Sequence, residues 1–393
     1  MNEQRNIRWQ QDIEQLGRKL PEGHRNLFFH RKKQEFYRDI EELKNNVQYF
    51  DDYELYAQIG KIVAAIKDAH TSAFFNFRSF LPFELYWFAD GIYVVSTTEK
   101  YIKVLNCKIT HINGITMEEI IDIVKTIVSY ENESYLKAQL PKYLPAIELL
   151  YGLEIVDDID KVNTTFKDID DNKIELCIES ENLEDFRKNF INSRNDDLSK
   201  DLLPLYMRNP HKYYWHEYLE EFKTLYFKYN ACREMVGEPI NKICNEMLYL
   251  LENEDIDKFV IDLRDNFGGN STLLDSFIKA LSKYEHINKK GKLFVIVGRE
   301  TFSSALLNTY LLKNKTEAIF VGEPTGGKPN CYGEIGRFIL KNSGIVITYS
   351  TKYYELIEDD NMLSFVPDIS LEIDIDNYIK NQDPYLEYIL DKK

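Results

Sequence analysis

The sequence lacks a long basic run, a paired-cysteine motif and a long apolar segment. Contact with nucleic-acid phosphates needs clustered Lys and Arg, so a net charge of −16 without a basic run argues against a nucleic-acid partner. No stretch approaches the roughly 20 apolar residues that cross a bilayer, and no membrane span is expected. Internal repeats and low-complexity tracts are also absent, which excludes repeat architectures.

The five cysteines are odd in number and widely spaced. They include no CxxC pair, so neither a zinc site nor a disulfide framework is expected, and a reducing compartment fits them better. The first residues, MNEQRNIRWQQDIEQLG, contain no apolar core of a secretory signal. We therefore expect a cytoplasmic protein without metal or cofactor, or an exported one if a signal has been removed.

The chain is long enough for two or three domains, because 393 residues exceed a typical single domain. Helical spacing of apolar residues predicts a helical N-terminal domain over residues 1–75. Residues 76–203 are expected to be β-rich, with strand patterns that include KYIKVL at 100–105. Residues 204–393 alternate strands and helices, which predicts an α/β domain.

Three strand-and-turn units follow one another in residues 259–328, where the apolar runs are FVIDL, KLFVIV and EAIFV. Ligands of open α/β sheets bind at the carboxyl edge, where such runs end. Gly268 and Gly269 offer N–H groups unshielded by side chains, as an oxyanion site needs. Ser303 and Ser304 stand where a strand gives way to a helix, whose N-terminus favours negative charge. This arrangement predicts acyl transfer with a serine nucleophile.

The order of these motifs resembles the serine peptidase family of C-terminal processing (tail-specific) proteases and the tricorn protease core. The family motifs DLRxNxGG, SxA and GExTxGK are matched by DLRDNFGG at 262–269, SSA at 303–305 and GEPTGGK at 322–328. The resemblance is strong over about 255–370 and looser over 50–150. It implies a crotonase/ClpP-like spiral of ββα units and the activity of a serine-type peptidase, a hydrolase.

The middle region carries a second, local resemblance. Its stretch CKITHINGITMEEIIDIV looks like the end of a PDZ-like unit, in which a strand, a turn and a helix follow one another. Modules of this kind bind peptides by adding a strand to the edge of a sheet. The expected substrates are therefore peptides or unfolded proteins. The oligomeric state is left open, a homo-oligomer included.

The resemblance to the peptidases implies that Ser303 is the nucleophile, with the backbone N–H groups of Gly269 and Ser304 as the oxyanion hole. The other interpretation of the serine pair is a cap for the helix that follows it. A serine hydroxyl needs a base within hydrogen-bond reach. His70, in a DxHT element similar to the histidine site of the tricorn-like branch, is the expected base. Lys328, which matches the lysine of the tail-specific branch, is the alternative.

A histidine base needs an orienting acceptor, and in the tricorn-like branch a glutamate precedes a PD element. The matching position here is Asn361, and Asp360 lies directly before it. The chain also has Tyr332 where the tail-specific branch has glutamine, and Leu306 where it has an acidic residue. These departures motivate the rival hypothesis, a catalytically decayed peptide-binding or scaffold protein.

Two further motif residues are expected to be structural. Asp262 and Arg264 of the DLR strand are predicted to form a buried ion pair that holds the glycine turn. Glu323 is expected to have a similar scaffolding role.

Overall fold

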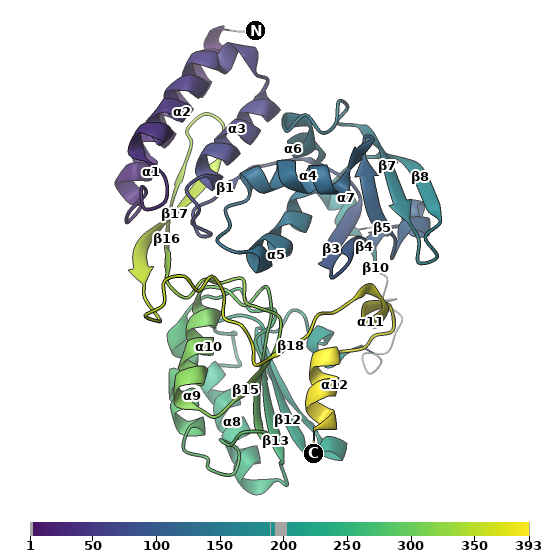
Figure 1. Ribbon diagram of the computed structural model, residues 1–393, viewed down its shortest axis with the longest axis vertical. Helices are drawn as coiled ribbons and strands as arrows, with labels where there is room; N and C mark the ends of the chain where they lie inside the picture. The colour runs from purple at the N-terminus through teal and green to yellow at the C-terminus, as the bar shows by residue number, and fades with distance from the viewer. Residues whose placement is uncertain (1–2, 189, 193–202, 393) are drawn as a thin grey trace. The chain divides into compact units, whose positions relative to one another are not determined.

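The computed structural model describes residues 3–188, 190–192 and 203–392. Contacts divide the chain into two compact units of mixed helix and sheet (Figure 1). The first unit comprises 1–131, 136–196 and 331–354, and the second 132–135, 197–330 and 355–393. The domain boundaries predicted from the sequence, 1–75, 76–203 and 204–393, remain predictions. Residues 331–354 fall within the last of those ranges and belong by their contacts to the first unit.

The first helices of the chain pack on a small antiparallel sheet of the first unit. These elements are α1 (Glu3–Gly23), α2 (Lys33–Asn46), α3 (Asp52–Ala64), β1 (Ala73–Phe74), β16 (Cys331–Ile339) and β17 (Val346–Tyr354). Helix α3 begins with a capping box, in which Asp51 and Glu54 each accept the other's backbone N–H. Apolar side chains of the helices and of the β16–β17 hairpin share one core. The helices expected near the N-terminus are therefore present, and their core is completed by a distant hairpin.

The rest of the first unit is built around a seven-stranded sheet. Its elements are β2 (Ser79–Phe80), β3 (Phe83–Phe88), β4 (Gly91–Thr98), β5 (Lys108–Ile112), β6 (Ile115–Thr116), α4 (Met117–Val124), α5 (Glu133–Tyr143), α6 (Ile147–Gly152), β7 (Lys161–Lys167), β8 (Lys173–Glu179), β9 (Glu181–Asn182), α7 (Leu183–Lys188) and β10 (Phe190–Asn192). The expectation of a strand at 100–105 was wrong: Glu99–Val104 forms a 3-10 helix. Tyr101 there is buried in the sheet's core, so packing outweighs the strand propensity of the run.

The second unit contains a six-stranded sheet in the order β11-β12-β13-β14-β15-β18. Its elements are β11 (Tyr214–Leu219), β12 (Thr224–Tyr229), α8 (Ile240–Asn253), β13 (Lys258–Asp262), α9 (Asp275–Leu281), β14 (Leu293–Val297), α10 (Ser304–Lys315), β15 (Ile319–Gly322), β18 (Ile369–Ser370), α11 (Ile375–Ile379) and α12 (Pro384–Asp391). Strands β12, β13, β14, β15 and β18 run parallel, and only β11 is antiparallel. The ends of β13, β14 and β15 therefore meet at one edge, as the three strand-and-turn units predict.

The two faces of this sheet have different partners. Phe259 and Ile261 of β13 enter the core shared with α8 and α9. On the other face, Lys258 donates from Nζ to the carbonyl oxygen of Ile389 in α12 over 3.0 Å. Figure 1 shows α8, α9 and α10 on one side of these strands and α12 on the other. The sheet that carries the motif turns is thus packed on both faces.

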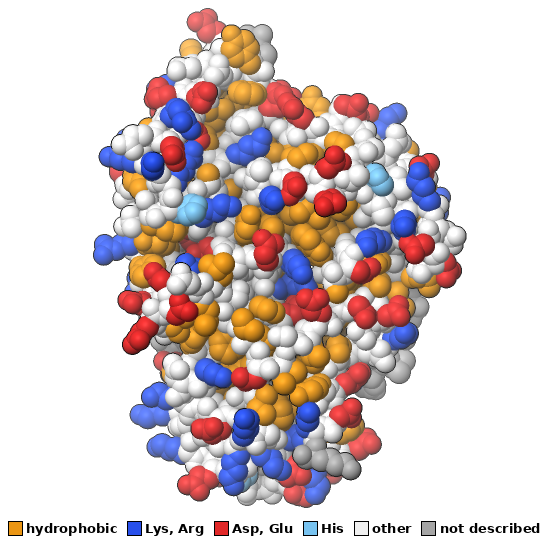
Figure 2. All heavy atoms as spheres, in the orientation of Figure 1, with side chains coloured by type: hydrophobic (Ala, Val, Ile, Leu, Met, Phe, Trp, Pro, Cys, Tyr) orange, Lys and Arg blue, Asp and Glu red, His pale blue; other side chains and the backbone are white. Residues whose placement is uncertain are grey.

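The molecular surface in view carries both signs of charge. Acidic and basic side chains are interspersed on the face in Figure 2, and no large region of that face is basic only. Of the helices in the described ranges, none has the length and apolar character needed to cross a membrane.

Candidate active site

Ser303 occupies a strained backbone position at the start of α10. Its φ is 52° and its ψ −123°, a conformation that residues with a Cβ atom rarely adopt. The helix begins at Ser304, so the predicted junction between strand unit and helix is confirmed. Ser303 holds the N-cap position, but its side chain makes no capping hydrogen bond. The capping interpretation therefore does not account for this serine.

The glycine turn after β13 packs directly on the serine turn. A Cβ atom built on Gly268 would lie 2.8 Å from the Cβ of Ser303 and 3.0 Å from the backbone nitrogen of Ser304. A Cβ on Gly269 would lie 2.2 Å from the carbonyl oxygen of Cys232. Both glycines have positive φ, 107° and 137°. Only glycine fits at either position without displacing the neighbouring backbone.

Two backbone N–H groups are available beside Ser303. The bridge between Cys232 and Gly269 uses the carbonyl of Gly268 and the N–H of Asn270, at 3.0 and 2.7 Å. In such a bridge the N–H of Gly269 points to the opposite side. The N–H of Ser304 belongs to the first turn of α10, where helical N–H groups have no partner within the helix. The Oγ of Ser304 donates to the Gly269 carbonyl over 2.6 Å, which joins the two segments.

Asn266 ties the glycine and serine turns together. Its carbonyl accepts the N–H of Phe302 over 3.1 Å, and its side-chain oxygen accepts the N–H of Gly268 over 3.0 Å. Its amide donates to the carbonyl of Tyr229 over 2.8 Å, and the side chain is fully buried. Sequence reasoning gave Asn266 no role. Its place in the DLRDNFGG motif was the available signal.

Thr301, two residues before Ser303, also joins neighbouring turns by hydrogen bonds. Its hydroxyl donates to the carbonyl of Leu263 over 2.8 Å and accepts the N–H of Gly298 over 3.0 Å. The backbone carbonyl of Thr301 accepts the N–H of Gly327 over 3.2 Å. All three strand ends are therefore connected through one buried threonine.

Lys328 follows a residue that packs on the first turn of α10. A Cβ on Gly327 would lie 2.7 Å from a methyl carbon of Leu306. The lysine itself is half-buried. Ser303, Ser304, Gly269 and Lys328 therefore belong to one edge of the second unit. Asp360 and Asn361 belong to the same unit and are exposed; Asp360 accepts from the Asn330 amide over 2.9 Å, and Asn361 donates its backbone N–H to Asp359 over 3.0 Å.

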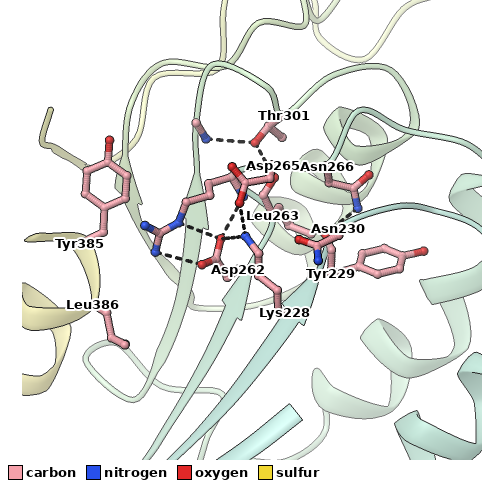
Figure 3. A network of polar contacts seen from close by, with 12 residues as sticks. Lys228, Tyr229, Asn230, Asp262, Leu263, Asp265, Asn266, Thr301, Tyr385 and Leu386 are labelled. Atoms are coloured by element: carbon pink, nitrogen blue, oxygen red, sulfur yellow. Dashed lines mark hydrogen bonds and ion pairs between the residues drawn. The ribbon is translucent and has the colours of Figure 1, made fainter. Parts of the chain in front are cut away.

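The predicted ion pair between Asp262 and Arg264 is confirmed, and it is part of a larger buried network (Figure 3). Arg264 also makes two hydrogen bonds of 2.9 Å to Asp383. Lys228 lies 3.3 Å from Asp262, with its side chain fully buried. Burial by itself raises the pKa of Asp262, but Arg264 and Lys228 outweigh it and lower the pKa to about 2. The network fixes the end of β13, from which the glycine turn departs.

Glu323 has the expected scaffolding contact. Its carboxylate accepts from Nε of Arg299 over 2.8 Å, and both side chains are buried. The pair joins the turn after β14 to the turn after β15.

His70 lies in the first unit, in the loop between α3 and β1. Its side chain is 3% exposed, and its Nδ1 lies 4.0 Å from a carboxylate oxygen of Asp68. Burial lowers the pKa of His70 below its ordinary value, while the charge of Asp68 and a hydrogen bond to the backbone of Tyr332 act in the opposite direction. The candidate base and the candidate nucleophile are thus carried by different units.

The chain has the fold of mature CPAF. It is 12% identical to CPAF in complex with lactacystin, with a TM-score of 0.67 over 98% of this chain and 97% of that one. A second structure of mature CPAF is also 12% identical, with a TM-score of 0.64 over 98% and 96%.

A further solved structure is similar to the chain at a lower TM-score. The photosystem II D1 C-terminal processing protease is 13% identical over 97% of this chain and 96% of that one, with a TM-score of 0.44. No protein-family model matches the chain, and no curated protein matches it in sequence. At these identities the likeness is one of fold, so the chemistry has to come from the residues of the site.

Proposed function

We propose that the chain is a serine-type peptidase that hydrolyses peptide bonds through an acyl-enzyme at Ser303. The backbone of Ser303 carries this proposal, because its φ of 52° is held at the N-terminus of α10 against Gly268. Such strain costs about 1–3 kcal/mol and persists where the surrounding structure imposes it, typically at active sites. A serine on a sharp turn from strand to helix exposes its hydroxyl for attack.

The N–H groups of Gly269 and Ser304 would stabilise the oxyanion of the tetrahedral intermediate. They come from the two turns that Asn266 joins, so their spacing is fixed before substrate binds. Such preorganised donors are worth about 10²–10³-fold in rate each.

His70 is the proposed base, which takes the Ser303 proton and later returns it to the leaving amine. A neutral imidazole is required for the first step, and the burial that lowers the pKa of His70 favours that form. Lys328 remains the alternative base, because it belongs to the same edge of the second unit as Ser303. Asp360 or Asn361 is proposed as the orienting group for His70.

Several finer properties belong to the same proposal. We expect the ββα spiral of the crotonase/ClpP type in the catalytic region and a PDZ-like module in the middle region. Peptides or unfolded proteins are the proposed substrates, held as extended chains at a sheet edge. The proposed location is the cytoplasm, or the cell exterior if a signal has been removed, and a homo-oligomer stays open.

The test is the pH dependence of peptide hydrolysis for the wild type beside Ser303→Ala, His70→Ala and Lys328→Ala. We expect Ser303→Ala and His70→Ala to be inactive, and Lys328→Ala to keep an acid limb of histidine type. An inactive Lys328→Ala with an active His70→Ala would assign the base to the lysine instead.

A fluorophosphonate probe separates the enzyme from the rival scaffold function. Asn361 and Tyr332, which stand where the family has glutamate and glutamine, favour that rival. A wild-type chain that cleaves no peptide of a broad library and leaves the probe unreacted is a scaffold. Labelling at Ser303 with hydrolysis of esters alone would assign another acyl substrate.

A further inference from the structure

The carboxylate of Asp68 is the centre of a buried polar cluster in the first unit. Its side chain is fully buried, and one of its oxygens accepts from Thr71 Oγ1 over 2.5 Å, Ser350 Oγ over 2.6 Å and His24 Nε2 over 3.0 Å. The other oxygen accepts the backbone N–H of His70 over 3.0 Å. A buried carboxylate with four donors is held in its charged form.

The pKa of Asp68 agrees with this geometry. Burial by itself raises that pKa, but the His24 hydrogen bond, the nearby His70 and the two hydroxyl groups outweigh it. The pKa therefore lies below its ordinary value, and the carboxylate is negative throughout the pH range in which a histidine base works.

His24 cannot neutralise this charge while its hydrogen bonds are kept. Its Nδ1 accepts the backbone N–H of Asn26 over 3.0 Å, so Nδ1 carries no proton. The proton of the ring is then on Nε2, which donates to Asp68. A second proton would have to displace the Asn26 amide, and the side chain of His24 is fully buried. The hydrogen bonds thus assign the neutral Nε2–H form.

The ring of His70 faces the same carboxylate. Its Nδ1 lies 4.0 Å from the Asp68 oxygen that accepts the His70 backbone N–H. Thr348 on β17 holds the other side of the residue, because its hydroxyl donates to the His70 carbonyl over 2.9 Å. Among the described residues, Asp68 of the same loop lies beside the His70 ring, and Tyr332 of β16 forms a hydrogen bond to His70 through its backbone. The ring of His24 packs on the ring of Tyr332, with 5.2 Å between the ring centroids. The negative charge that acts on His70 is that of Asp68.

We propose that Asp68 is a positioning residue for His70, and that His24 keeps the negative charge of Asp68 available by remaining a neutral donor. The inference rests on the proposed function, in which His70 accepts the Ser303 proton. As the imidazolium forms, the fixed charge of Asp68 stabilises it without any movement of the protein. Asp68 thereby supplies a negative charge from His70's own loop, in addition to the orienting group proposed at Asp360 or Asn361.

The test measures the imidazole pKa of His70 by NMR in the full chain labelled with [13Cε1]histidine, with His70→Gln to assign the signal. In Asp68→Asn we expect the pKa of His70 to fall by about one unit or more, because an opposite charge at this distance is removed. The acid limb of kcat/KM should move to lower pH by the same amount, and the plateau should drop roughly 10- to 100-fold.

Ser350→Ala is the matched control, because it removes one donor to Asp68 and keeps the charge. We expect no fall in the His70 pKa in this variant. A destabilised Asp68→Asn with an unchanged His70 pKa would make Asp68 merely structural and overturn the proposal.

A wild-type measurement covers the case in which Asp68→Asn fails to fold. The 15N shifts of His24 at neutral pH should be those of the Nε2–H tautomer, and a doubly protonated His24 would overturn the proposal. The NMR titration needs no turnover. If the chain has no peptidase activity, the proposed function is refuted. The NMR titration would still decide whether Asp68 acts on His70.

Discussion

Gly268 lies so close to Ser303 that the glycine turn and the serine turn are in direct contact. A Cβ on Gly268 would be 2.8 Å from the Cβ of Ser303 and 3.1 Å from the carbonyl oxygen of Phe302. Real Cβ atoms essentially never come within 3.0 Å of another heavy atom, so the 2.8 Å contact means that any side chain at position 268 has to move the serine. The backbone conformation of Ser303 therefore requires glycine at position 268, in another segment of the chain.

Gly268→Ala is expected to lower kcat/KM by about 100-fold, because a displacement of the nucleophile by roughly 1 Å has this effect. Gly291→Ala is the control: its φ of 86° is equally unfavourable for alanine, but no atom lies within 4 Å of the new methyl group. Both variants should lose stability through backbone strain, and only Gly268→Ala should lose activity. Equal activities on a fluorogenic peptide would refute the steric coupling.

Replacing Ser303 by glycine should relieve strain while removing the nucleophile. We expect Ser303→Gly to exceed Ser303→Ala in free energy of unfolding by up to about 1 kcal/mol, since glycine tolerates positive φ. The opposite order is expected at Ser276, an exposed position inside α9, where alanine is the better helix former by about 1 kcal/mol. Urea unfolding of Ser303→Gly, Ser303→Ala, Ser276→Gly and Ser276→Ala measures the free energy of unfolding of each variant. If glycine and alanine rank in the same order at both positions, the backbone strain at Ser303 is contradicted.

Asp383→Ala should be strongly destabilising, because it leaves the buried guanidinium of Arg264 without its two 2.9 Å hydrogen bonds. Breaking a buried pair on one side costs about 3–5 kcal/mol. In the matched exposed pair, Asp376 lies 3.2 Å from Lys380, and Asp376→Ala should cost less than about 1 kcal/mol. Similar unfolding midpoints for the two variants would show that the network contributes little.

The stability of the second unit should fall in acid through Asp262. Its pKa of about 2 in the folded chain is below the ordinary value of 3.8, so the folded state favours the charged form. The contribution is fully present above about pH 4 and is lost as the pH falls towards 2; at neutral pH it is on the order of 2 kcal/mol. The difference in unfolding free energy between wild type and Asp262→Asn should therefore narrow between pH 5 and pH 2.5. A constant difference across that range would contradict the assignment.

Much of the local structure followed from the sequence. The N-terminal helices and the junction at Ser303 are predicted from patterns of neighbouring residues, and the structure has both where they were expected. The parallel strands that bring the motif turns to one edge also follow the predicted alternation of strands and helices. The run at 100–105 was predicted wrongly, because the burial of Tyr101 under the sheet is a long-range effect.

The sequence by itself determined the motifs, since glycine, serine and charged residues at fixed spacing act on the backbone within a few residues. Only the tertiary structure decided which distant residues share a site. Asp68 gathers donors from position 24 after α1 and position 350 on β17, and Asn266 joins the serine and glycine turns. Buried polar groups need partners, and those partners come from whichever segments the fold brings within about 3 Å. No spacing along the chain encodes that choice.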